Sequence, residues 1–216
     1  TFVGADAGKG GTTSAPYSSG NNSTAVGYQA LDALTTGYST AFGVGAGGAV
    51  TSGYANVLLG TSAGGGLSTH FRNVVVGDSA GRTFGYSNST IVGFGCADRA
   101  SGDYNVYIGG QAVGGTTATG ASNTVVGFQA MGISTGPQGA ANTVAIGQQA
   151  LLHTSSSNAV AVGYRAGYAN QSAGNVFMGY QAGQYTTSGA SNTFIGQQAG
   201  QGITGTRLTG ASNTAV

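Results

Sequence analysis

The sequence lacks several of the residue types on which most enzymes and compact domains depend. It has no tryptophan, no glutamate, one cysteine, two prolines and only 5% charged residues. One cysteine excludes a disulfide framework within the chain. The few cations are scattered, so we expect no nucleic-acid partner, which would need clustered Lys and Arg. No apolar run approaches the length of a membrane span, so we expect no membrane insertion.

Glycine and apolar residues dominate instead. Gly contributes 43 of the 216 residues, and apolar residues make up 40%. Disordered chains normally carry many charges or prolines, so this composition indicates a folded chain that buries apolar side chains. The glycines follow no every-third spacing, which excludes a collagen helix.

A short phrase, Asn-Thr-apolar-apolar-Gly-x-Gln-Ala, recurs along the whole chain, for example at Asn123–Ala130 and Asn192–Ala199. Its glycines are Gly4, Gly27, Gly43, Gly60, Gly77, Gly93, Gly109, Gly127, Gly147, Gly163, Gly179 and Gly196. Eight of the eleven spacings between them are 16 or 17 residues, and the others are 23, 18 and 20. This period predicts a parallel β-solenoid or β-roll with one phrase in each coil. Residues 1–216 are expected to form a single array of about 12 coils, truncated at both ends and therefore a segment of a longer fibre.

The same spacing excludes helices. Glycine recurs every few positions, at a cost of about 1 kcal/mol each inside a helix, and no 3.6-residue periodicity persists. Further glycines, such as Gly37 and Gly120, precede the phrase and can supply the positive φ of tight turns. Each repeat of this all-β fold is therefore expected to form a strand, a turn, a short strand and a second turn.

Two adjacent columns of the phrase are apolar, the one directly before the glycine and the one before that. Adjacent strand residues point to opposite faces, so both faces need burial. One solenoid has one interior. We expect the earlier column, which includes Leu58, Tyr107 and Phe177, to face outward against other copies of the chain. A homo-oligomer whose copies lie side by side follows from this reading.

A small residue stands three positions after the phrase glycine. It is alanine in eleven copies of twelve and cysteine in the other, which indicates a slot that only a small side chain fits. This small-residue column includes Ala30, Ala63, Ala80, Cys96, Ala112, Ala130, Ala150, Ala166, Ala182 and Ala199. Cys96 is therefore interpreted as a small buried side chain.

A glutamine often stands two positions after the phrase glycine. The glutamines are Gln29, Gln111, Gln129, Gln149, Gln181 and Gln198. Stacked amides can hydrogen-bond from coil to coil, and we favour this structural role. The aromatic residues beside this column are Tyr28, Phe94, Phe128, Tyr164 and Tyr180. Together with exposed glutamines they give the alternative, a surface that holds a sugar.

No residue pattern indicates catalysis, a cofactor or a metal. The carboxylates are Asp6, Asp32, Asp78, Asp98 and Asp103. His70 and His153 lie between phrases without a recurring partner, whereas catalysis needs a nucleophile with a base or paired carboxylates. Calcium-binding rolls carry an Asp in every repeat, and this chain does not. We therefore expect no enzyme, with polysaccharide cleavage by carboxylates on adjacent coils as a minority alternative.

The phrases resemble two known families. Asn142–Gly147 and Asn158–Gly163 resemble the head repeats of trimeric autotransporter adhesins, and Ser23–Leu31 resembles the repeats of phage tail fibres. The resemblance implies a left-handed parallel β-roll built as an intertwined or side-by-side homotrimer. It implies a non-enzymatic extracellular segment of a phage tail fibre that serves host attachment. The alternative is the head of an adhesin on the bacterial outer surface. The full-length fibre would bind a cell-surface glycan or protein receptor.

The long spacings mark the places where specific contacts are expected, because loops tolerate insertion and carry function. The candidate binding residues in these loops are Pro16, Tyr17, Pro137, Gln138 and Arg207.

Ice binding is a minor alternative that needs regularly spaced threonines. The threonine column of the phrase includes Thr24 and Thr124, but valines such as Val57 and Val74 interrupt it.

Overall fold

The computed structural model describes residues 1–10, 22–83, 85–114, 119–132, 139–202 and 209–216. These residues form short β-strands joined by turns, and no helix is present among them. Within those ranges there is accordingly no helix long and apolar enough to cross a membrane. The chain divides into two compact units, an N-terminal unit (Thr1–Asn105) and a C-terminal unit (Val106–Val216).

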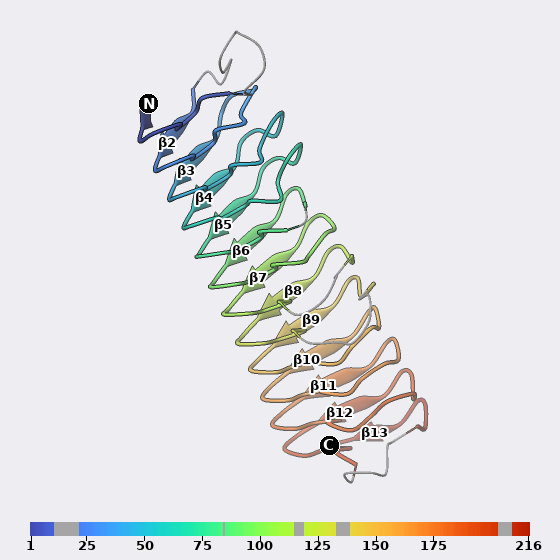
Figure 1. The fold of residues 1–216 in the computed structure, drawn as a ribbon. Helices are drawn as coiled ribbons and strands as arrows, with labels where there is room; N and C mark the ends of the chain where they lie inside the picture. Colours follow the sequence, from blue (N-terminus) through green and yellow to red (C-terminus); the bar gives the residue numbers. More distant parts are fainter. Residues whose placement is uncertain (11–21, 84, 115–118, 133–138, 203–208) are drawn as a thin grey trace. The chain divides into compact units, whose positions relative to one another are not determined.

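Each unit is a parallel β-solenoid in which every coil adds one short strand to a sheet (Figure 1). The strands of the N-terminal unit pair in chain order as β1 (Phe2–Val3), β2 (Thr24–Val26), β3 (Thr40–Phe42), β4 (Val57–Leu59), β5 (Val74–Val76) and β6 (Thr90–Val92). Those of the C-terminal unit are β7 (Val106–Ile108), β8 (Thr124–Val126), β9 (Val144–Ile146), β10 (Val160–Val162), β11 (Val176–Met178), β12 (Thr193–Ile195) and β13 (Thr214–Ala215).

The strands pair in register, so equivalent phrase residues lie beside one another. Leu58 of β4 pairs with Val75 of β5, and Phe177 of β11 pairs with Phe194 of β12. The predicted all-β parallel solenoid with a spacing of about 17 residues is therefore confirmed. Its left-handedness, its trimeric state and its continuity as one array of coils stay predictions.

The expectation about which apolar column faces outward is wrong. The middle strand residues point inward, and Leu58, Phe177 and Tyr107 are at most 1% exposed. The residues directly before the phrase glycine face outward instead, and Leu59 and Ile146 are each 38% exposed. Alternation along a strand separates the two faces but cannot identify the inner one when both are apolar.

The side of each coil opposite the strand consists mostly of turns. The second short strand expected in each repeat is not formed among the described residues. In the coil of β8, Ser122, Gln129 and Met131 have φ of 60°, 54° and 47°. Such left-handed residues bend the chain too often for a second strand to extend. The turns still bond to the next coil, as the Met131 N–H does to the Ala150 carbonyl at 2.9 Å.

Candidate functional site

The phrase glycines occupy positions where a side chain would be doubly unfavourable. All eleven predicted repeat glycines have positive φ: Gly27, Gly43, Gly60, Gly77, Gly93, Gly109, Gly127, Gly147, Gly163, Gly179 and Gly196. Gly127 has a φ of +137°, which L side chains rarely adopt. A Cβ on Gly127 would lie 2.6 Å from the carbonyl oxygen of Gly147 in the next coil. Both the backbone conformation and the close approach of successive coils thus require glycine here.

The small-residue column lies in the interior. Nine of its ten members have no exposed surface: Ala30, Ala63, Ala80, Cys96, Ala112, Ala130, Ala150, Ala166 and Ala182. Ala199 is partly exposed. Burial raises the pKa of the Cys96 thiol to about 12, because the interior disfavours the thiolate. The column therefore packs the coils and presents no reactive group.

A buried polar ladder that the sequence interpretation missed runs inside the coils. It occupies the position four residues before the phrase glycine, where Asn73 and Asn192 are at most 1% exposed. The Asn73 N–H donates to Asn56 Oδ1 at 3.1 Å, and the Ser89 N–H donates to Asn73 Oδ1 at 3.0 Å. The Asn213 N–H bonds to Asn192 Oδ1 in the same way at 2.8 Å. The recurrence of Asn or Ser at this position was the available signal.

The glutamine ladder expected from the sequence is present in the C-terminal unit. Gln129 Nε2 donates to Gln111 Oε1 at 3.1 Å, and Gln149 Nε2 donates to Gln129 Oε1 at 3.1 Å. Gln129 thus donates to the preceding coil and accepts from the following one. In the N-terminal unit the column continues from Gln29 with Gly45, so an amide ladder is not repeated there.

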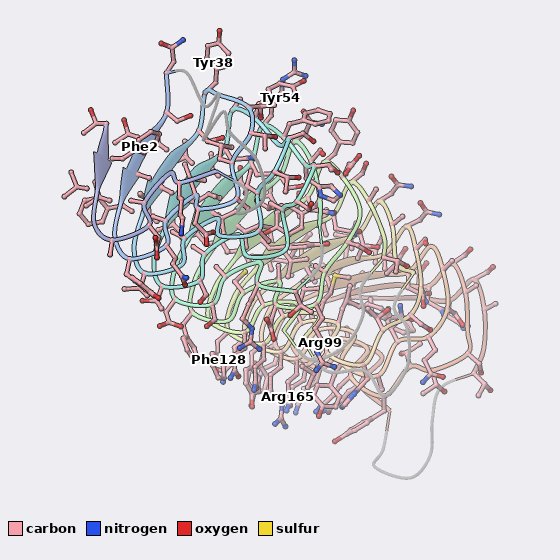
Figure 2. The ribbon with its side chains drawn as sticks, turned by 45° about the horizontal axis from the view of Figure 1, so that its top comes forward. Phe2, Tyr38, Tyr54, Arg99, Phe128 and Arg165 are labelled. Atoms are coloured by element: carbon pink, nitrogen blue, oxygen red, sulfur yellow. The ribbon has the colours of Figure 1, made fainter. Side chains whose placement is uncertain are left out.

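Arg165 interrupts this ladder. Its Nε donates to Gln149 Oε1 at 2.8 Å, which is the bond that a glutamine would make. Its Cζ atom lies 5.2 Å from the ring centroid of Tyr164 and 5.2 Å from that of Tyr168. The Tyr164 ring stacks on Tyr180 with the centroids 5.3 Å apart. Figure 2 shows Arg165 and Phe128 projecting from the same edge of the coils. This edge combines aromatic rings, amides and one cation.

A second aromatic cluster lies in the N-terminal unit, at the turn before the strands. The rings of Tyr54 and Phe71 stack with centroids 5.1 Å apart and an interplanar angle of 7°. The Arg72 Cζ atom lies 5.6 Å from the Phe71 centroid and 6.0 Å from that of Tyr54. Arg72 is exposed to solvent. Tyr54 and the exposed Tyr38 lie on one side of the unit (Figure 2).

Two of the acidic residues, Asp6 and Asp98, form ion pairs among the described residues. Lys9 Nζ lies 3.2 Å from Asp6 Oδ1. Arg82 binds both carboxylate oxygens of Asp98, through Nε at 3.1 Å and Nη2 at 3.2 Å. Burial, with a smaller contribution from the charge of Asp6, raises the pKa of Asp32. These contacts fit stabilised turns and offer no arranged acid and base.

The histidines also have structural surroundings. His153 Nε2 lies 3.2 Å from Tyr168 Oη, and the two rings meet edge to face. The carbonyl oxygen of His70 accepts a bond from Asn56 Nδ2 at 2.9 Å. Asp103 accepts the Ser87 N–H at 2.8 Å. In the part of the chain that the structure describes, no group of three or more His, Cys, Asp or Glu side chains could hold a metal ion.

The five candidate binding residues of the long loops lie outside the described residues. They are Pro16, Tyr17, Pro137, Gln138 and Arg207. The prediction that specific contacts gather in these loops therefore stays a prediction.

Comparisons with known proteins do not assign the chain to a family. No family model, no curated protein and no solved structure matches the chain.

Proposed function

We propose that the chain is a non-enzymatic structural segment of a homotrimeric extracellular fibre. The observation that carries this proposal is the outward face of the sheet. In the N-terminal unit it presents Phe42, Val57 and Leu59, which are 59%, 37% and 38% exposed. In the C-terminal unit it presents Ile108 and Met178, which are 38% and 43% exposed. Parallel sheets are normally covered on both faces, so this face needs a partner.

A second copy of the chain is the partner that fits best. Successive coils present equivalent outward pairs, such as Val144 with Ile146 and Val160 with Val162. Copies that lie side by side in register therefore meet the same surface in coil after coil, and each contact that forms is repeated along the sheet. A face this apolar would otherwise be an aggregation hazard. The number three, and the left-handed sense of the β-roll, come from the resemblance to adhesin heads and tail fibres.

The biological setting of the proposal is a phage tail fibre. The phrase at Ser23–Leu31 carries this choice, and the low charge and the absence of an arranged catalytic pair among the described residues support a mechanical role. A rigid stack of coils gives the fibre reach and stiffness. Attachment to a host receptor is then a property of the full-length fibre.

Gold-labelled antibodies raised against the chain test this setting. Applied to virions and to bacterial cells from the source of the gene, they should mark fibres on the virion in electron micrographs. Labelling of the bacterial surface in the absence of virions would contradict the phage proposal and favour an adhesin head.

Ice binding draws weaker support from the same face. The threonines at the first strand position, Thr40 and Thr124 among them, do share the outward side. Valines at Val57 and Val74 break the array. A solution of the chain should show no thermal hysteresis. A measurable difference between its melting and freezing points would support ice binding.

A further inference from the structure

We propose that the break in the glutamine ladder at Arg165 binds a carboxylate-bearing sugar, namely a uronate unit of an acidic polysaccharide. The site lies on the turn after β10, outside the sheet face assigned above to contacts between copies. It adds a binding activity to the proposed structural role and does not depend on how many copies associate.

The break removes one acceptor from the ladder. Gln111, Gln129 and Gln149 each offer an oxygen to the next coil, but a guanidinium carries donors only. The next rung, Gln181, uses Oε1 to accept from Gln201 Nε2 at 3.0 Å. No acceptor for Gln181 Nε2 occurs among the described residues, and neither of their two ion pairs involves Arg165. An oxygen atom from outside the chain could accept the hydrogen bond that Gln181 Nε2 offers.

The charge of Arg165 points to an anionic acceptor. All five acidic residues of the sequence lie in the N-terminal unit, so the C-terminal unit contains no carboxylate side chain. Arg165 is nevertheless half-buried. A partly desolvated cation without a counter-ion is unfavourable, and a carboxylate accepts bidentate bonds from a guanidinium.

The guanidinium is also held in place before any ligand binds. The rings of Tyr164 and Tyr168 and the oxygen of Gln149 fix it from three directions. A side chain that is already ordered loses little conformational entropy on binding, so its bonds contribute more to affinity.

The surroundings favour a sugar over an acidic peptide. The Tyr180 ring stacks on Tyr164 and is 49% exposed. The negative face of an aromatic ring attracts the C–H groups of a pyranose. Gln148, on the coil before Tyr164, and Gln197, on the coil after Tyr180, are exposed and offer amides to hydroxyl groups. An acidic peptide would find no such use for the ring and the amides, because its backbone carries neither a pyranose C–H face nor hydroxyl groups.

Isothermal titration with hexagalacturonate and with its full methyl ester tests the proposal, because the ester removes the negative charge and keeps the sugar rings and their hydroxyl groups. The chain is expected to bind the acid at least about tenfold more tightly than the ester, as a charge-assisted hydrogen bond implies. Arg165→Gln should weaken binding of the acid by a similar factor. This substitution installs the ladder's own residue, so the fold should survive, which circular dichroism checks.

Arg99→Gln is the matched control, since it removes the same charge from an exposed arginine of the N-terminal unit and should leave binding unchanged. Equal binding of acid and ester, wild-type binding by Arg165→Gln, or binding of neither sugar would overturn the proposal. Tighter binding of hexa-aspartate than of hexagalacturonate would overturn the choice of a sugar. Sedimentation of Arg165→Gln should match the wild type, which keeps this test separate from the association of copies.

Discussion

Replacing Gly127 with alanine probes the stacking of the coils at a point where two of them approach closely. Two costs add at this position. A non-glycine residue at a φ of +137° carries strain of about 1–3 kcal/mol. The new Cβ would also lie 2.6 Å from the carbonyl oxygen of Gly147, which belongs to a hydrogen-bonded backbone and cannot swing away. Overpacking of this kind costs a further ~1–3 kcal/mol.

Two further alanine substitutions separate these costs. Gly196 has a φ of +124°, but the nearest atom to its Cβ would be the Val216 carbonyl carbon at 3.6 Å, so Gly196→Ala isolates the strain. Gly139 has nothing within 4 Å of an added Cβ. Its φ is not in the positive region, so Gly139→Ala should stabilise the chain by about 0.4–1 kcal/mol.

Urea unfolding followed by circular dichroism measures the series through the transition midpoints. The expected order of stability is Gly139→Ala, wild type, Gly196→Ala and then Gly127→Ala. If Gly127→Ala is no less stable than Gly196→Ala, successive coils do not approach each other as closely as described. If both match the wild type, the positive φ of the phrase glycines is wrong.

Four other substitutions test the interior. Ala130→Leu should overpack the small-residue column and lower the unfolding free energy by about 1–3 kcal/mol. Ala199 is partly exposed, so Ala199→Leu should lower it by less. Equal effects of the two substitutions would contradict the burial of the column. Asn73→Ala leaves the buried Ser89 N–H without its acceptor and should lower the unfolding free energy by about 1–3 kcal/mol. An unchanged urea midpoint would show that the polar ladder contributes nothing to stability. The Cys96 thiol should resist maleimide at pH 8 until the chain unfolds, because its folded pKa of about 12 lies above the ~8.5 of a free thiol. For the same reason the wild type should lose stability relative to Cys96→Ala as the pH rises from about 8.5 toward 12, since only the unfolded thiol ionises there; parallel pH profiles would contradict the burial.

The solenoid itself could be predicted because its period and its glycines are backbone requirements. Gly127 and Gly147 recur in the sequence because they lie against each other in successive coils. They are glycines because their backbone has a positive φ that residues with side chains rarely adopt. The inner face could not be read from the apolar columns alone, because Leu58 and Leu59 are equally apolar. Asn56 would have decided it. It stands two residues before Leu58, on the same side of the strand, and its amide is bonded inside the coils.

The site at Arg165 was beyond sequence reasoning for a different reason. In the sequence Arg165 is one more variation in a column that also contains Ser62 and Ser79. Arg165 stands out only once the donors and acceptors of the hydrogen bonds from Gln129 and Gln149 are known, and these are seen in the structure alone. The aromatic neighbours were visible in the sequence, but the lack of an acceptor for Gln181 Nε2 among the described residues was not.

Sedimentation velocity tests the central claim, that the outward sheet face joins copies of the chain. The wild type should sediment as a stable trimer. The double substitution Leu59→Lys and Ile146→Lys, which charges the face in both units, should yield a monomer with an unchanged β-type circular dichroism spectrum. Gln171→Lys, at an exposed position outside the strands, should remain a trimer. A wild-type chain that sediments as a folded, soluble monomer would contradict the account.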